Sequence, residues 1–91
     1  MDYIVYILFS QKRSKYYVGQ THNINERFKR HNNGFVPSTK SGLPWELVLT
    51  LKVETRSEAL KLEKKIKKRG IKRYLLDNQL GEYHAKKLGR T

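Results

Sequence analysis

The 91-residue chain has no cysteine, only one methionine and one tryptophan, and two prolines. Without cysteine, neither a disulfide framework nor a thiolate metal site can stabilise the fold. No apolar run approaches the roughly 20 residues of a membrane span, and the first residues lack the basic start of a signal peptide. The sequence therefore indicates one small domain with one modest core, and we expect a cytoplasmic protein without membrane association.

Acidic residues are also scarce. The sequence has eight Asp and Glu and twenty Lys and Arg, which gives a formal net charge of +12 at pH 7. Such an excess creates a positive potential that suits a polyanion, most often a nucleic acid. An acidic protein or membrane surface would fit the same charge, and basic solvated surfaces are common. The charge therefore favours a nucleic acid as the partner, and it does not distinguish DNA from RNA.

Two short segments near the start predict a β-hairpin. Residues 3–9 are apolar on both faces, as in a central strand, and residues 15–21 are rich in aromatic and β-branched side chains. The polar residues 10–14 suit a hairpin turn, so the two strands should be antiparallel neighbours. In the second strand Tyr17 and Gly19 share one face, so Gly19 should leave an open spot beside the Tyr17 phenol.

The first predicted helix begins at Asn23, because Glu26 follows three residues later as in a capping box. It should end where Gly34 can adopt the left-handed conformation. On the helical wheel Arg27 and His31 lie beside the buried stripe rather than opposite it, an unusual place for two polar residues. Purely structural roles also fit, because an arginine stem can pack on apolar surface and a cationic histidine suits a helix C-terminus.

Residues 35–44, with two prolines and a glycine, predict a loop of more than the usual length. Residues 45–53 alternate imperfectly and predict a third strand, half open to solvent. Its buried face should carry every second residue, namely Trp45, Leu47, Leu49, Leu51 and Val53.

The second helix has the clearest start, because Thr55 and Glu58 form a capping box, and it should end at about Arg69. Its apolar arc should contain Ala59, Leu60, Leu62 and Ile66. Glu63 falls inside that arc, where burying an unpaired carboxylate would cost several kcal/mol. A bound cation would remove the cost, and so would an ion pair with Lys67 one turn on.

The predicted order is strand, strand, helix, strand, helix, which indicates an α+β fold with a three-stranded antiparallel sheet flanked by helices. We expect a single domain over residues 1–80, in which residues 71–76 could add a short helix. Residues 81–91 should form a flexible C-terminal tail. The sequence contains no internal repeat or linker.

Several motifs, taken together, resemble the GIY-YIG nuclease superfamily. Val5-Tyr6-Ile7 and Tyr17-Val18-Gly19 resemble its paired motif, and residues 23–34 resemble its next helix. Segments that resemble its small stand-alone bacterial members are Ser38-Thr39-Lys40, Pro44-Trp45-Glu46-Leu47-Val48 and residues 58–67. The resemblance covers residues 3 to about 69 and extends to the nuclease domain of the excision-repair incision subunit.

The resemblance implies a metal-dependent phosphodiesterase, which needs an activated water, a divalent ion and positive groups for developing charge. It implies that Glu63 binds Mg²⁺ or Mn²⁺ and that Arg27 contacts the phosphate. Tyr6 and Tyr17 correspond to the motif tyrosines, with Tyr17 placed to orient the water, and His31 takes a family position near the site. Given the motif, we favour a metal at Glu63 over an ion pair, although both tyrosines could be ordinary sheet aromatics with satisfied hydroxyls.

Cationic side chains gather on the face of the second helix opposite Glu63, where they could bind phosphates or simply be solvated. We assign to nucleic-acid binding Lys40, Lys61, Lys64, Lys65, Lys68 and Arg69. Relatives carry a supporting downstream asparagine, for which Asn78 is the nearby candidate. The predicted function is a DNA endonuclease of repair or recombination, and the alternatives are a non-catalytic nucleic-acid-binding module and a basic protein adaptor.

Overall fold

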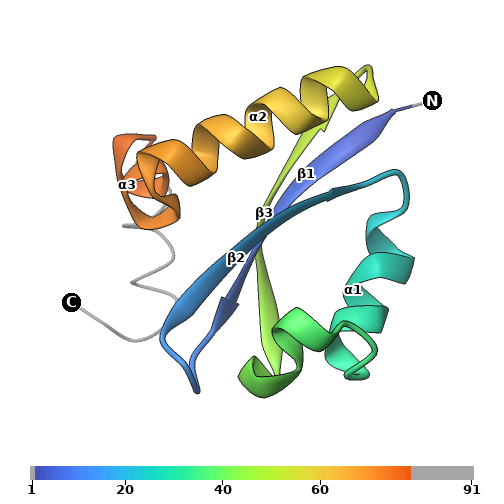
Figure 1. The fold of residues 1–91 in the computed structure, drawn as a ribbon, viewed down its shortest axis with the longest axis vertical. Coiled ribbons are helices and arrows are strands. Elements are labelled where there is room, and N and C mark those ends of the chain that lie inside the picture. The colour runs from blue at the N-terminus through green and yellow to red at the C-terminus, as the bar shows by residue number, and fades with distance from the viewer. Residues whose placement is uncertain (1, 79–91) are drawn as a thin grey trace.

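The computed structural model describes residues 2–78, and its elements follow the predicted order (Figure 1). The strands are β1 (Tyr3–Ser10), β2 (Lys15–Thr21) and β3 (Trp45–Val53). The helices are α1 (Ile24–Asn32), the 3₁₀ helix η1 (Pro37–Gly42), α2 (Arg56–Arg69) and α3 (Ile71–Asp77). The predicted flexible tail, residues 81–91, lies outside the described residues.

The three strands form one antiparallel sheet in the order β2-β1-β3, which confirms the predicted α+β fold and the central place of β1. In β1 successive side chains alternate between the two faces. Val5 and Ile7 belong to one buried cluster, whereas Tyr6 and Leu8 belong to the other. The central strand is therefore covered on both sides.

One layer of helices packs on each face of this sheet, so that α2 and α1 lie on opposite sides of the strands (Figure 1). The core beneath α2 and α3 consists of Val5, Ile7, Val18, Ala59, Ile66 and Leu75. The core on the α1 side consists of Tyr6, Leu8 and Trp45, with Tyr17, Ile24, Phe28 and Leu43 packed against it. The α1 side therefore holds both motif tyrosines.

Local sequence signals set the helix ends as predicted. The Asn23 side chain accepts a hydrogen bond from the backbone N–H of Glu26 at 3.1 Å, and Thr55 caps α2 in the same way. Gly34 and Gly70 follow the helices with φ of +75° and +95°, where a side chain would be strained.

The prediction that β3 buries all its odd-numbered residues on one face is wrong. The pairing of β3 with β1 shifts by one residue at Val48, which is a β-bulge. Because one extra residue reverses the alternation, Leu49 and Leu51 pack on the α2 side while Trp45 joins the opposite core. The bulge thereby brings the only tryptophan of the chain to the side of the motif tyrosines.

Leu60 was predicted in the apolar arc of α2, and this is also wrong, because it is 41% exposed. The helix buries Ala59 and Ile66 and partly buries Leu62. These three lie within a narrow arc of the wheel, and Leu60 lies about 100° from Ala59, beyond the part of α2 that the sheet covers.

Candidate active site

Tyr6 lies at the centre of a cluster of polar and aromatic side chains on the α1 side of the sheet. Its side chain is fully buried, and its hydroxyl is 2.9 Å from Nε2 of His31. The ring of Tyr17 lies edge-on to the His31 ring, with 5.1 Å between centroids, and 6.3 Å from the Tyr6 ring. The structure thus brings together three predicted site residues from β1, β2 and α1.

A chain of hydrogen bonds fixes the protonation of His31. Thr39 donates its hydroxyl proton to the carbonyl of Val36 at 3.3 Å, so its oxygen accepts from Nδ1–H of His31 at 2.8 Å. Nε2 is then the unprotonated nitrogen and accepts the hydroxyl proton of Tyr6. His31 is therefore a neutral imidazole, buried between two hydroxyl groups.

The electrostatics of the cluster agree with these assignments. Burial lowers the pKa of His31 below its ordinary 6.5, and the nearby charge of Arg27 lowers it further. Burial also raises the pKa of Tyr6 to about 12, so the phenol keeps its proton at neutral pH. This result contradicts the structural role considered for His31, because a neutral ring cannot serve as a cation at the helix end.

Arg27 and Glu63 act on the same phenol from two different helices. A hydrogen bond and the charge of Arg27 lower the pKa of Tyr6, whereas the charge of Glu63 raises it. Since such interactions weaken with distance, both charged groups belong to the neighbourhood of Tyr6. Tyr6 is therefore a residue on which both predicted charged side chains act, Arg27 more strongly than Glu63.

Glu63 is mostly buried at the edge of α2, as its place in the apolar arc predicted. Its side chain is 19% exposed, and its Oε2 lies 2.8 Å from the ammonium group of Lys67. This contact raises the pKa of Lys67, and the positive charge of the ammonium group lies against the negative carboxylate. The ion pair that we ranked below a metal is therefore present in the structure.

The loop before β3 holds Thr39 against the cluster. Six of its residues form the 3₁₀ helix η1, within the segment that the sequence predicts as a loop. The indole N–H of Trp45 donates to the carbonyl of Thr39 at 2.7 Å, and the Ser10 hydroxyl donates to the carbonyl of Gly42 at 2.6 Å. Both bonds tie η1 to neighbouring strands, so the hydroxyl that orients His31 sits on a fixed backbone.

Sequence reasoning missed two residues that support the site. Thr39 is fully buried beside His31, and Asn32 pairs its amide with the backbone N–H and carbonyl of Trp45 at 2.7 and 3.1 Å. Nothing in the sequence separated Thr39 from Ser38 or Ser41, because all three are hydroxyl residues of one loop.

The expected open spot beside Tyr17 does not exist, because Tyr6 fills it. Tyr6 pairs with Gly19 across the β1–β2 ladder. A β-carbon on Gly19 would lie 2.6 Å from the Tyr6 hydroxyl oxygen and 3.2 Å from Cε2 of Tyr17. The glycine is required so that the Tyr6 ring can cross β2 and reach His31.

We therefore expect Gly19→Ala to destabilise the fold by about 1–3 kcal/mol, the usual cost of forcing extra volume into a packed core. Urea denaturation measures the loss. Tyr6→Phe in the same chain removes the nearest clashing atom and should reduce the cost of the alanine. Equal costs of the alanine in both backgrounds would show that the contact with the Tyr6 hydroxyl is not the cause.

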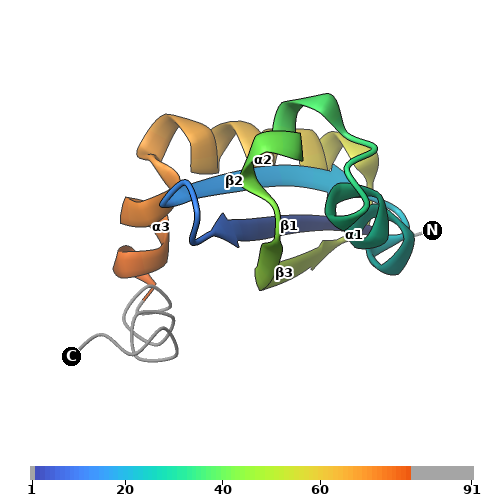
Figure 2. The same cartoon turned by 90° about the horizontal axis from the view of Figure 1, so that it is seen from below.

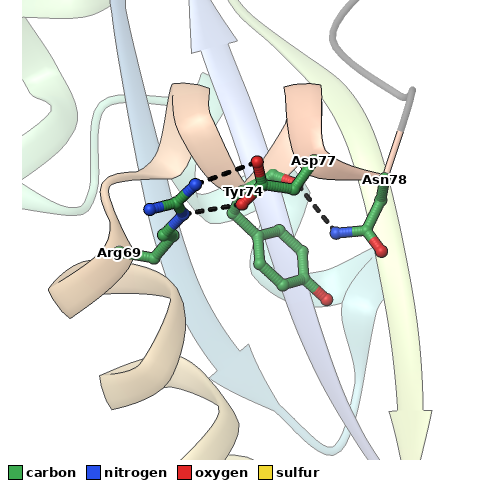
Figure 3. A network of polar contacts seen from close by, with 4 residues as sticks. All are labelled: Arg69, Tyr74, Asp77 and Asn78. Atoms are coloured by element: carbon green, nitrogen blue, oxygen red, sulfur yellow. Dashed lines mark hydrogen bonds and ion pairs between the residues drawn. The ribbon is translucent and has the colours of Figure 1, made fainter.

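The residues assigned to nucleic-acid binding lie outside this cluster. Lys40, on η1, is exposed, and the cationic residues of α2 are exposed on its far side from Glu63. Arg69 donates two hydrogen bonds to Asp77, at 2.6 and 3.0 Å, while Asn78 donates to the carbonyl of Tyr74 (Figure 3). Asn78 thus lies beside Arg69 rather than among the residues around Tyr6, and the binding assignments stay predictions.

No group of three or more His, Asp or Glu that could hold a metal ion occurs within residues 2–78. A divalent ion at Glu63 would therefore take its remaining ligands from water and substrate. Mg²⁺ is commonly bound in this manner, through one or two carboxylates together with substrate phosphates. The carboxylate fits such an ion if Lys67 releases it.

Comparison with known families agrees with the fold. The family described as the GIY-YIG catalytic domain matches residues 2–74, so the chain belongs to the GIY-YIG family, a nuclease superfamily whose enzymes act on nucleic acid. No curated protein matches the chain. Within the described residues, no helix has the length and apolar character needed to cross a membrane.

A solved relative has the same size. The NMR structure of the UPF0213 protein BH0048 from Bacillus halodurans is 29% identical in sequence and superposes with a TM-score of 0.58. The match covers 100% of both chains.

Proposed function

We propose that this protein is a divalent-metal-dependent DNA endonuclease that hydrolyses phosphodiester bonds in DNA repair or recombination. The observation that carries the proposal is the buried cluster of Tyr6, His31 and Tyr17, whose central phenol also feels the charges of Arg27 and Glu63. One positive and one negative side chain, held near a packed aromatic wall, suit the charges of a phosphodiester and a cation. The net charge of +12 supplies the attraction for DNA.

Each residue of the cluster has a distinct role in the proposal. Arg27 binds the phosphate, and its guanidinium stabilises the charge that develops there. Tyr17 lies partly open to solvent beside His31 and orients the attacking water. Tyr6 and His31 are fully buried, so they act as positioning residues that hold Tyr17 and Arg27 in place.

Glu63 would hold the cation. When bound, a divalent ion polarises the phosphate and lowers the pKa of a coordinated water. The rest of the cluster needs no titration at neutral pH, because Tyr6 keeps its proton and His31 stays neutral. The Tyr6 phenol therefore serves as a hydrogen-bond donor and not as the general base.

The second candidate is a nucleic-acid-binding module without turnover. The ion pair between Lys67 and Glu63 favours it, because an ammonium group on the carboxylate replaces the charge that a metal would supply. The two candidates differ in what happens to DNA once it is bound.

Incubation with branched, nicked and plasmid DNA in Mg²⁺ or Mn²⁺ tests the proposal. We expect new termini that appear only with the metal and are abolished by EDTA. DNA binding that weakens with salt, without metal-dependent cleavage, would instead establish the binding module.

Lys67→Ala is expected to strengthen metal binding by about 1.4- to 2.3-fold, because an i,i+4 ion pair on a helix contributes about 0.2–0.5 kcal/mol. Titration with Mn²⁺ in the absence of DNA measures the affinity by the loss of the free-ion EPR signal. Lys68→Ala removes the same charge from the next position of α2 and should leave the affinity unchanged. If both variants behave alike, Lys67 does not compete for the carboxylate.

A further inference from the structure

A groove of about 450 Å³ lies between the start of β2 and the junction of α2 and α3. The turn between β1 and β2 and the helix α3 lie at the same end of the molecule (Figure 2). The lining residues are Ser14, Lys15, Tyr16, Lys67, Ile71 and Lys72. The floor is fixed, because Tyr16 packs on Phe9 with 4.8 Å between centroids and Ile71 packs against the core.

The charge of this groove has one sign. Three of its six lining residues are lysines, and none is acidic. Lys15 and Lys72 are exposed, and within residues 2–78 neither forms an ion pair. A concave surface with lysines over an apolar floor is complementary to a phosphate backbone.

One lining residue of the groove also contacts the candidate active site. The third lysine of the groove, Lys67, contacts the carboxylate of Glu63 at 2.8 Å. Lys15 pairs with Ser10 in the sheet, so it lies at the opposite end of β2 from Thr21. A strand that leaves Glu63 along the outer edge of β2 would reach Lys67 first and then Lys15 and Lys72.

A second basic pocket, on the far side of α2, is less suited to this role. It measures about 690 Å³ and is lined by Lys65, Lys68, Arg69 and Arg73, but Asp77 forms part of its wall. The carboxylate of Asp77 repels phosphate and holds two donors of Arg69 (Figure 3). On the helical wheel Lys65 and Lys68 lie about 140–160° from Glu63, away from the site.

We infer that the groove of Lys15 and Lys72 binds backbone phosphates of the DNA strand that flanks the scissile phosphate. The inference rests on the proposed function and deepens it, because it gives the substrate a direction across the protein, along the β2 edge toward α3. It differs from the assignment of DNA binding to the outer face of α2. On this inference, that face adds only a general positive field.

Fluorescence anisotropy of a labelled single-stranded oligodeoxynucleotide, in EDTA to prevent cleavage, measures binding directly. We compare the wild-type chain with Lys15→Ala/Lys72→Ala and with Lys61→Ala/Lys65→Ala, which removes two lysines from the competing outer face of α2. Both double variants lose two exposed positive charges, and circular dichroism melts verify that both remain folded.

The groove variant should bind at least about tenfold more weakly at 100 mM salt, and its plot of log K against log salt should be shallower by about 1.4. The affinity of Lys61→Ala/Lys65→Ala for the oligonucleotide should fall by less than about threefold. Equal losses, or a larger loss in Lys61→Ala/Lys65→Ala, would overturn the inference and assign binding to the outer face of α2. An unchanged affinity of Lys15→Ala/Lys72→Ala would also overturn the inference. The two lysines would then be solvated charges near the β2 edge of the sheet.

Different results would contradict the proposed function and the proposed binding of DNA in the groove. A wild-type chain that binds the oligonucleotide but never cleaves DNA in Mg²⁺ loses the nuclease assignment, while the two double variants still decide where DNA binds. A wild-type chain that does not bind at low salt overturns the groove as well.

Discussion

Glu63→Gln is expected to reduce metal-dependent cleavage by about 10²–10³-fold or more, the usual range for losing one electrostatic contact to the reacting groups. Glutamine keeps the shape of the side chain and removes its charge. Glu63 is the acidic side chain whose charge acts on the Tyr6 phenol, so the variant removes that negative charge from the neighbourhood of Tyr6. Cleavage of labelled DNA under single-turnover conditions measures the loss.

The loss should not come from unfolding. The pair that Glu63 makes with Lys67 is an i,i+4 contact on a helix, which contributes about 0.2–0.5 kcal/mol. The free energy of unfolding, measured by urea denaturation, should therefore change by less than about 1 kcal/mol. Glu54→Gln, at an exposed glutamate between β3 and α2, is the matched control and should retain wild-type cleavage.

The variant also discriminates between the two candidate functions. A binding module has no need of the carboxylate, so Glu63→Gln would bind DNA as well as the wild type or better, because one negative charge is removed. Cleavage that survives the substitution would place the metal and the chemistry elsewhere. Equal loss in Glu54→Gln would show that the assay responds to net charge rather than to the site.

The features that the sequence predicted well are those that a few neighbouring residues decide. Asn23 and Thr55 begin their helices because a side-chain oxygen meets an N–H three residues on. Glu63 could be singled out because helical periodicity alone places it among apolar side chains. Its low exposure of 19% follows from that local pattern.

The features that the sequence could not give depend on pairing between distant segments. Trp45 changes faces because of a bulge at Val48, and a bulge is set by the register against β1 rather than by β3 itself. The space over Gly19 is closed by Tyr6 of the neighbouring strand. The composition of β2 or β3 alone predicts neither the face that Trp45 takes nor the filling of the space over Gly19.

His31 combines a feature that the local sequence predicts with a feature that depends on distant segments. Its place at the margin of the buried stripe was visible from the helical wheel, but its partners come from β1 and η1. A histidine at the end of a helix is ordinarily read as a favourable cation. Only the hydroxyl groups of Tyr6 and Thr39 show that it is a buried neutral ring.

His31→Ala is therefore expected to destabilise the fold by about 2–4 kcal/mol. The ring is fully buried, so its removal leaves a cavity, and it leaves the hydroxyls of Tyr6 and Thr39 without their shared partner. His22→Ala makes the same change at an exposed position and should alter stability by less than about 0.5 kcal/mol. Urea denaturation of the three chains gives the comparison.

The same residue makes stability depend on pH with a definite sign. The folded chain holds the pKa of His31 below 6.5, its ordinary value in an unfolded chain, so the unfolded state binds more protons between the two values. The contribution of His31 is fully present above pH 6.5 and is lost as the pH falls through the folded pKa. Protonation would place a cation between two hydroxyls and near Arg27.

The difference in stability between wild type and His31→Ala should therefore shrink as the pH falls below about 6.5. The other histidines of the sequence are common to both chains, so the difference reports on His31. A difference that grows toward acid pH would mean that the folded state favours the imidazolium, and would reverse the assignment of Nε2 as an acceptor. Because the Tyr6 proton is donated to that nitrogen, such a result would also remove the reason why Tyr6 remains a donor at the centre of the site.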